Sequence, residues 1–337
     1  MPTRKHQVGL IGTGPLSELH LATLSQLDRA QVSAIYWRDG ADPEALARRY
    51  GCRVDAYSNL KEMLSDASID VVSICAPSSD RAGLAIEAAK AGKHLILETP
   101  MALSLQDCEK IKETIDAAKV KVCVCFEARF ASQLVTTKAM LGRGLLGRVH
   151  YAEVDYYKGY GAELAEAASQ PEGHALRVTE CQAIDALLFL LGGDVRSVSS
   201  YTTRSDNREL ASVVGPTTSV SIVRYRDGRL GKVTSTIDCL QPPYFRLHLI
   251  GSEGTLLDNQ FYTRALGGLK RERWSELAVE PMGSPQAVSE RYLAMFRSFF
   301  QALDRGQQMS PTGLTEAMLT HELLFAAENS AERHRRR

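Results

Sequence analysis

The chain has 337 residues, of which 44% are hydrophobic and 24% are charged. This length favours two domains, and this composition is that of an ordinary globular protein. Forty basic residues balance forty acidic ones, which argues against nucleic acid as a partner. No apolar run reaches the roughly 18 residues that span a membrane, so a membrane protein is not expected. The seven cysteines have no metal-ligand spacing and are odd in number, so we expect no metal site and a cytoplasmic location.

Short apolar runs alternate with helical patterns over the first 125 residues. Strands are expected at 7–11, 32–37, 69–75, 94–97 and 120–126, and helices at 15–27, 42–50, 81–91 and 105–118. This alternation predicts a parallel, doubly wound sheet.

A glycine loop lies directly between the first strand and the first helix. Gly12 permits a tight turn there, and Gly14 lets the backbone approach a pyrophosphate. The following helix N-terminus offers free N–H groups and a positive dipole end to that anion. The predicted cofactor contacts are Gly12, Thr13, Gly14, Pro15 and Leu16.

The end of the second strand bears on the choice of coenzyme. An acidic residue here would bind the adenosine ribose of NAD, but Trp37 occupies that place. Arg38 could pair with the 2′-phosphate of NADP, whereas Asp39 could still reach the ribose. We therefore expect NADP, with contacts from Trp37 and Arg38, and keep NAD as the alternative.

The second half of the chain has a different pattern. Strands are expected at 149–157, 219–225, 231–237 and 245–250, and helices at 180–191, 289–303 and 314–333. Alternation of apolar and polar residues with short turns predicts a mostly antiparallel sheet.

Four segments of the chain resemble the Gfo/Idh/MocA oxidoreductases. They are residues 8–14 with His20, residues 91–100, residues 250–256 and residues 325–331. The resemblance implies an α/β protein with an N-terminal Rossmann domain at 1–125 and a C-terminal α/β domain at 126–337. The second domain would carry an open, mostly antiparallel sheet, through which family members form homodimers or homotetramers.

The same resemblance implies where the active site lies. Further cofactor contacts would come from Ala76, Pro77, Ser78, Glu98, Thr99 and Pro100. Thr99 stands at the position of the family's lysine, and Gln182 at the position of its histidine. Val178 replaces the first acid of that helix motif, and Asp185 retains the second. Ser78 and Arg81 replace the asparagine and histidine that the family favours. The expected catalytic residues are Thr99, Gln182 and Asp185.

These replacements change the expected chemistry of proton transfer. Thr99 and Gln182 can donate hydrogen bonds, but neither titrates near neutral pH. Asp185 could carry the proton if burial raised its pKa, or could only orient its neighbours. Weaker candidates, each with a structural alternative, are Cys181, Tyr156, Tyr157, Tyr160 and His174. Glu127 and Arg129 could bind a polar substrate or pair with each other.

Two functions remain open at this point. The first is an NAD(P)-dependent oxidoreductase with a non-standard proton route. It would move a hydride to or from a small carbonyl, imine, conjugated or sugar-like substrate. The alternative is a non-redox protein that binds NAD(P), such as a sensor, a partner subunit or a non-redox catalyst.

Overall fold

The computed structural model describes residues 4–37, 42–159, 175–240, 242–280, 282 and 285–336. The chain divides into two compact units. The first comprises Met1–Glu127 and Val288–Met318, and the second comprises Ala128–Ala287 and Leu319–Arg337. The first unit thus includes the whole of the helix that the sequence predicts at 289–303. The domain limits of 1–125 and 126–337 stay a prediction about folding units.

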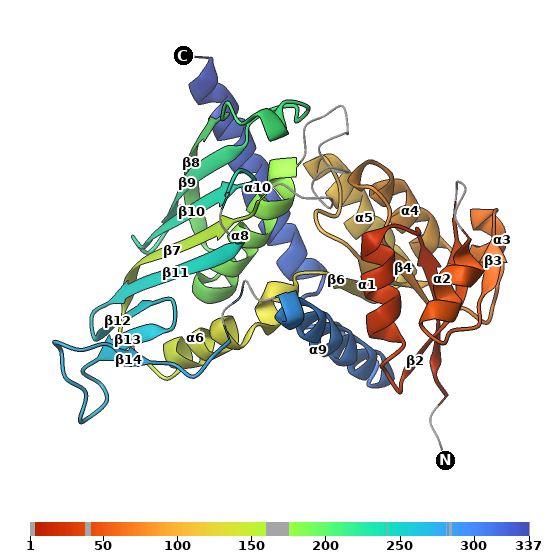
Figure 1. Cartoon of the computed structure of the whole chain (residues 1–337), viewed down its shortest axis with the longest axis horizontal. Helices are drawn as coiled ribbons and strands as arrows, with labels where there is room; N and C mark the ends of the chain where they lie inside the picture. Colours follow the sequence, from red (N-terminus) through yellow and green to blue (C-terminus); the bar gives the residue numbers. More distant parts are fainter. Residues whose placement is uncertain are drawn as a thin grey trace. The chain divides into compact units, whose positions relative to one another are not determined.

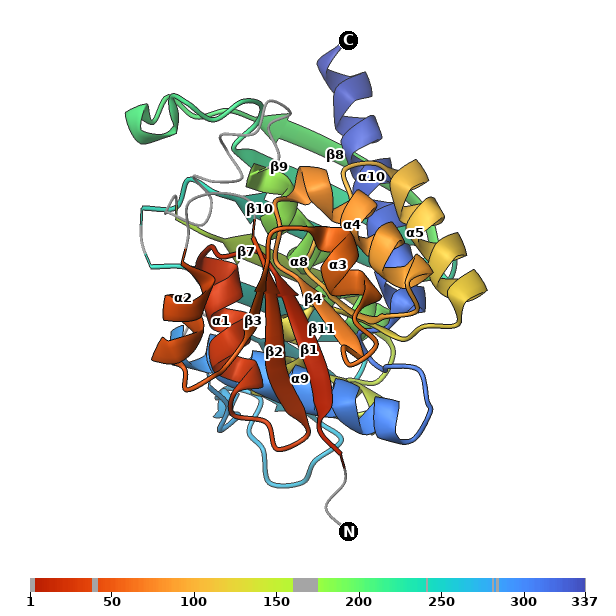
Figure 2. The ribbon, with the colours of Figure 1, turned by 90° about the vertical axis from the view of Figure 1, so that its right-hand side faces the viewer.

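The first unit is built on a six-stranded sheet in the order β3-β2-β1-β4-β5-β6. All of its neighbouring strands are parallel. Figure 2 shows β1 between β2 and β4. The strands are β1 (His6–Ile11), β2 (Ala30–Tyr36), β3 (Asp55–Tyr57), β4 (Val71–Ile74), β5 (His94–Leu97) and β6 (Val122–Val124). The predicted Rossmann sheet is therefore confirmed.

Local sequence explains where the helices of this unit begin. Pro15 opens α1 and Pro43 opens α2, at the position where a missing N–H does not matter. The Ser104 side chain accepts from the Asp107 amide and caps α5. The helices are α1 (Pro15–Leu24), α2 (Pro43–Arg49), α3 (Leu60–Ser65), α4 (Ser78–Lys90), α5 (Leu105–Ala118) and α9 (Pro285–Asp304). A 3-10 turn, η1 (Glu127–Phe130), begins at the last residue of the Met1–Glu127 segment and continues into the second unit.

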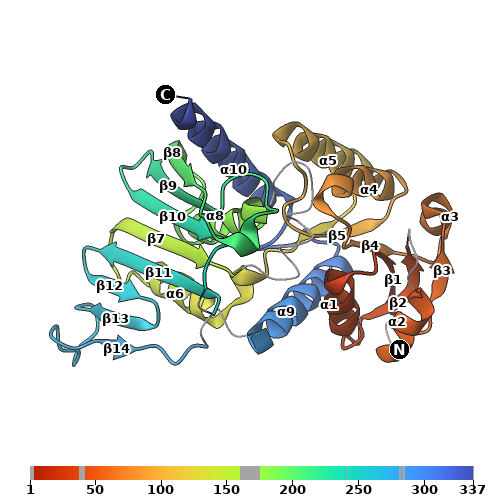
Figure 3. The same ribbon diagram turned by 45° about the horizontal axis from the view of Figure 1, so that its top comes forward.

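The second unit contains an eight-stranded sheet in the order β14-β13-β12-β11-β7-β10-β9-β8. Only β7 and β10 pair in parallel among the strands described, so the expected mostly antiparallel sheet is confirmed. The strands are β7 (Val149–Tyr157), β8 (Val195–Thr203), β9 (Thr218–Tyr225), β10 (Leu230–Thr236), β11 (Tyr244–Gly251), β12 (Gly254–Leu257), β13 (Gln260–Thr263) and β14 (Ser275–Glu276). Figure 3 shows this strand order.

The two faces of this sheet differ. Helices α6 (Ser132–Gly142), α8 (Ala175–Leu191) and α10 (Leu314–Arg335) lie on one face (Figure 1). A 3-10 turn, η2 (Arg208–Leu210), follows β8. The open face carries the exposed side chains of Tyr201, Ile222 and Leu230, because strand residues alternate between faces. Within the described part of the chain, no helix is both long and apolar enough to cross a membrane.

Candidate cofactor and substrate sites

The glycine loop after β1 has the tight geometry that its sequence predicts. Gly12 has a φ of +112°, a backbone conformation that is strained for every residue except glycine. A Cβ at Gly12 would lie 2.9 Å from Ser17 Oγ and 3.2 Å from the Cys75 carbonyl oxygen. Only glycine therefore allows the first strand to turn this closely into α1.

The N-terminus of α1 is open to a ligand. Gly14 is its N-cap and makes no side-chain hydrogen bond, and both Gly14 and Pro15 are exposed. The first backbone N–H groups of a helix have no partner within the helix, so they attract an anion. Ser17 Oγ is buried and has no hydrogen-bond partner among the described residues. These features fit the diphosphate of a dinucleotide.

The strand order places this corner at the switch point of the sheet. Strand β1 pairs with β2 on one side and with β4 on the other. In doubly wound sheets, dinucleotides bind outside the carboxyl ends of the strands at that point. The loop after β4 holds Ala76, Pro77 and Ser78 at the same edge. Trp37 directly follows β2 and donates its backbone N–H to the Tyr57 carbonyl oxygen at 3.3 Å. Arg38 and Asp39 lie outside the described residues.

A buried polar cluster supports the loop after β5. His20 Nε2 lies 2.7 Å from Glu98 Oε1, and His20 Nδ1 lies 2.7 Å from Ser73 Oγ. The Tyr292 hydroxyl, from α9, donates to Glu98 at 2.9 Å. Thr99 follows this glutamate in a cis peptide bond with Pro100 and is buried. The cluster thus fixes the position of Glu98 directly before Thr99.

The charges of this cluster stabilise each other. Burial would lower the pKa of His20, but the Cys75 sulfur and the Glu98 carboxylate raise it to about 10. Burial would likewise raise the pKa of Glu98, but His20, Arg81 and Tyr292 hold it below its usual value. The imidazolium and the carboxylate therefore form a buried ion pair.

The same cluster contains a possible metal-ligand set. His20, Glu98 and Cys125 place one ligand atom each within 4.8 Å of one another. His20 and Glu98 are already bonded to each other. Burial raises the pKa of the Cys125 thiol, whereas metal binding requires the thiolate. The donor chemistry therefore favours a hydrogen-bonded cluster over a metal centre.

Asp185, in α8 of the second unit, is fully buried and accepts hydrogen bonds from Arg129 and Thr320. Arg129 donates to both of its oxygens, each at 2.7 Å, through Nε and Nη2. The Thr320 hydroxyl, from α10, donates to Asp185 Oδ1 at 2.8 Å. A proton on Asp185 would remove the charge that Arg129 pairs with. This geometry suits an orienting carboxylate better than a proton carrier.

The remaining candidates are spread over both units. Thr99 belongs to the first unit, and Gln182, buried on α8, belongs to the second. Cys181 is also fully buried, and the Tyr157 hydroxyl donates to Asp155 at 3.1 Å. Tyr156 lies on β7 beside Phe245 of β11. Tyr160 and His174 lie outside the described residues.

Glu127 and Arg129 each lie against a charged residue from a distant part of the chain. Glu127 lies 3.6 Å from Arg291 of α9, whereas Arg129 binds Asp185. Sequence patterns could not assign these partners, because both come from distant parts of the chain.

Two buried groups were not predicted as functional residues. Glu180 on α8 is buried with Ser221 Oγ at 3.5 Å, and burial and the nearby Glu328 raise its pKa to about 7. Arg81 is buried in α4 and bonds to two separate loops. For Glu180, the sequence signal was a charged residue within an apolar helix. For Arg81, it was an arginine at the position where the family resemblance leads one to expect histidine.

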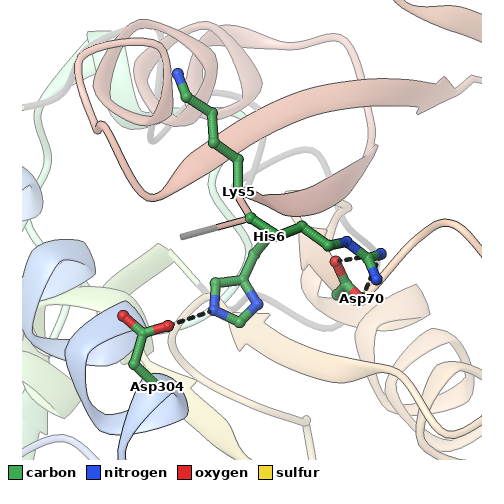
Figure 4. Close-up of a pocket in the computed structure, with 5 residues that line it drawn as sticks. Lys5, His6, Asp70 and Asp304 are labelled. Carbon is green, nitrogen blue, oxygen red and sulfur yellow. Dashed lines mark hydrogen bonds and ion pairs between the residues drawn. The ribbon is translucent and has the colours of Figure 1, made fainter. Parts of the chain in front are cut away.

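A pocket in the first unit lies at the opposite end of β1. It is lined by Arg4, Lys5, His6, Asp70 and Asp304 (Figure 4). His6 lies 3.0 Å from Asp304, and Arg4 lies 3.3 Å from Asp70. Because His6 begins the strand, this pocket is at the amino end of the sheet, away from the glycine corner.

Comparison with known proteins agrees with this architecture. Residues 6–126 match the model of an oxidoreductase family with an NAD-binding Rossmann fold. Residues 134–257 match the model of the GFO/IDH/MocA C-terminal domain.

Individual relatives are similar over different lengths. An uncharacterized oxidoreductase of Synechocystis is 30% identical over 190 residues, which cover 55% of this chain and 51% of that protein. The myo-inositol 2-dehydrogenase of Thermotoga maritima is 22% identical over 342 residues, 98% of this chain and 97% of that protein. 

A solved structure has the same fold over nearly the whole chain. It is an oxidoreductase from Agrobacterium radiobacter in complex with NAD+, L-tartaric acid and magnesium. The TM-score is 0.85 at 20% identity, over 98% of this chain and 97% of that one. The two family models together with the observed fold show that this chain belongs to the Gfo/Idh/MocA family of NAD-binding oxidoreductases.

Proposed function

We propose that this protein transfers a hydride between a nicotinamide dinucleotide and a small sugar-like, carbonyl, imine or conjugated substrate. The observation that carries this proposal is the glycine corner at the switch point, with its exposed helix N-terminus. The inositol dehydrogenase among its relatives supports a polyol or sugar-like substrate as the first to test.

The bound coenzyme would supply the hydride acceptor or donor. The chain itself would hold the diphosphate at Gly12, Thr13, Gly14, Pro15 and Leu16. Ala76, Pro77, Ser78, Glu98, Thr99 and Pro100 would line the nicotinamide half, because they follow β4 and β5. The buried ion pair of His20 and Glu98 would keep this part of the loop rigid before cofactor binds.

The proton route would differ from that of a lysine–histidine site. Thr99 and Gln182 would orient the substrate by hydrogen bonds, since neither side chain titrates. Asp185, held by Arg129 and Thr320, would support the Gln182 helix without exchanging the proton. A substrate that accepts a hydride readily, or that exchanges its proton with water, fits such a site best.

We propose NADP as the preferred coenzyme, with NAD as the alternative. Support comes from Trp37, which stands where a ribose-binding acid is expected, and from the neighbouring Arg38. Replacing Arg38 by alanine should weaken NADPH much more than NADH in a fluorescence titration. Equal weakening of both coenzymes would contradict the phosphate contact.

A non-redox role in binding NAD(P) is the second candidate. Two observations favour it. Positions 99 and 182 carry no titratable side chain, and the Asp185 carboxylate is already paired with Arg129. A sensor, a partner subunit or a non-redox catalyst would need the glycine corner but no proton carrier.

Turnover measurements separate the two functions. Purified protein would be mixed with NADPH or NADH and with panels of carbonyls, imines and enones, and with NADP+ or NAD+ and polyols. Absorbance of the reduced nicotinamide would report turnover, and heat-treated protein would serve as the control. Oxidation or reduction of the coenzyme with any substrate of these panels would support the oxidoreductase function. Tight binding of coenzyme without turnover on the whole panel would favour the non-redox role.

The open sheet face supports a homodimer or homotetramer as the working form. Tyr201 and Ile222 are 58% and 39% exposed on neighbouring strands of this face, and a group of exposed apolar side chains is typical of an interaction surface. Light scattering after size-exclusion chromatography would test this assembly. The seven cysteines are all free thiols, which supports a reducing, cytoplasmic location.

A further inference from the structure

Arg81 connects two loops at the carboxyl edge of the first unit's sheet. Its Nε donates to the Ala76 carbonyl oxygen at 3.0 Å, and its Nη1 donates to the Pro100 carbonyl oxygen at 2.9 Å. The same Nη1 lies 3.2 Å from Ser78 Oγ. The first loop follows β4 and the second follows β5, and these strands are neighbours. One side chain thus fixes the spacing between two adjacent loops.

The position of Arg81 is electrostatically unfavourable for a positive charge. Arg81 lies in the first turns of α4, where the helix dipole disfavours a cation. It is only 4% exposed, and burial lowers the pKa of its guanidinium, although Glu98 opposes that shift. Burying a cation at a helix N-terminus costs free energy. The hydrogen bonds of Arg81 must therefore stabilise the fold more than those of a neutral side chain would.

The two loops belong to one half of the dinucleotide site. A doubly wound sheet binds one nucleotide over each half of its strands, on either side of the switch point. The glycine corner after β1 serves the diphosphate, whereas β4 and β5 lie in the half that would hold the nicotinamide. The two loops that Arg81 joins would therefore contact the nicotinamide half of the coenzyme rather than the adenosine half.

We propose that Arg81 is a positioning residue that sets the loop after β4 and the loop after β5 at the spacing that binds the nicotinamide half of the coenzyme. This inference rests on the proposed function. It assigns to Arg81 a role in coenzyme binding that a purely structural residue of α4 would not have.

The test compares a complete coenzyme with its adenosine half. Binding of NADH, NADPH and ADP would be measured by calorimetry for the wild type, for Arg81→Met and for Arg81→Lys. Lys90→Met is the matched control, because Lys90 is exposed at the far end of the same helix. Thermal unfolding of each variant would be recorded in the absence of ligand.

The expected result is selective. Arg81→Met should weaken binding of the preferred reduced coenzyme by about tenfold, because only a minor fraction of the protein would keep the competent loop spacing, and change ADP affinity by less than about twofold. Arg81→Lys should lie between, since it keeps the charge but not both bonds. Lys90→Met should bind all ligands as the wild type does.

Other outcomes would overturn the inference in distinguishable ways. Unchanged coenzyme affinity in Arg81→Met, or equal weakening of coenzyme and ADP, would remove the specific role of Arg81. If Arg81→Met does not fold, the same comparison for Arg81→Lys decides between these results. A wild-type protein that binds neither NADH nor NADPH would instead overturn the proposed function itself.

Discussion

By the family resemblance Asp185 would retain an acidic residue of a helix motif, and its contacts decide what this residue can do. Both of its oxygens accept from Arg129, and Thr320 adds a third hydrogen bond. Removing one partner of a buried ion pair leaves the other charge without compensation. The most direct effect of losing this carboxylate should therefore be on stability.

Replacing Asp185 by asparagine should lower the free energy of unfolding by about 3 kcal/mol or more. Chemical denaturation would measure this. Asp194→Asn is a suitable control, since Asp194 forms an exposed ion pair with Arg226. If Asp185→Asn kept wild-type stability and lost a titration in the pH profile of turnover, Asp185 would be the proton carrier after all.

Glu180 is a second buried carboxyl group on the same helix. Burial, and next the Glu328 carboxylate, raise its pKa from 4.5 to about 7 in the folded protein, against the opposing effects of the nearby Ser219 and Ser221 hydroxyls and of Arg177. The folded state therefore holds a proton that the unfolded state releases between these two values. Stability should fall as pH rises through this window, by on the order of 3 kcal/mol in total.

The variant Glu180→Gln keeps the shape of the side chain but cannot ionise. It should unfold at a higher temperature than the wild type at pH 8, and at nearly the same temperature at pH 5. Differential scanning calorimetry at both pH values would measure this, with the exposed Glu332→Gln as the control. A pH-independent difference between Glu180→Gln and the wild type would show that the group does not titrate in this range.

Among the elements, the corner between β1 and α1 carries the cofactor assignment. Its geometry depends on a glycine with a φ of +112° packed against Ser17 and Cys75. An alanine there would be strained and would also meet these neighbours.

Gly12→Ala should weaken coenzyme binding at least tenfold in a calorimetric titration, because the turn must open to accept a Cβ. Gly51→Ala is the matched control: Gly51 also has a positive φ, of +69°, but nothing lies within 4 Å of its Cβ position. Both substitutions put a side chain at a positive φ, with less strain at Gly51, and only Gly12→Ala also meets close neighbours, so only the first should lose affinity. Similar affinities for the two variants would contradict the close-packed corner.

The sequence predicted a helix or strand correctly where the spacing of its apolar residues agreed with the residues that begin or end it. Strand β1 was predicted from a buried run that ends at a glycine, and helix α5 from a helical pattern between two strands. Strand β3 and helix α3 were not predicted, since three and six residues are too short to show a period. Strand β8 was missed because its serine-rich segment, Val195–Thr203, lacks a strong apolar alternation.

The sequence supplied the candidate residues of the site but not their partners, and the roles of these residues stay predictions. The glycines between a strand and a helix indicated the candidate coenzyme corner, and the family resemblance suggested Thr99, Gln182 and Asp185 as candidates. Neither could indicate that Arg129 would bind Asp185, or that Tyr292 would reach Glu98 from 194 residues away. Such pairs depend on the tertiary packing of α8, α9 and α10, which local patterns do not encode.

At the scale of the whole molecule, each of the two units carries a different part of the proposed reaction. The first unit contains the coenzyme corner and Thr99, and the second contains Gln182, Asp185 and the open sheet. A ligand that binds only the folded state stabilises it by mass action. Coenzyme binding should therefore raise the unfolding temperature of the first unit's transition.

The central claim is that the corner between β1 and α1 binds the diphosphate of a nicotinamide coenzyme. Isothermal titration calorimetry of the wild-type protein with NAD+, NADH, NADP+ and NADPH tests it most directly, with thermal unfolding of the same samples as a second readout. We expect saturable one-to-one binding of at least one reduced coenzyme per chain and a higher unfolding temperature. No heat of binding and no thermal shift with any of the four at millimolar concentration would contradict the account.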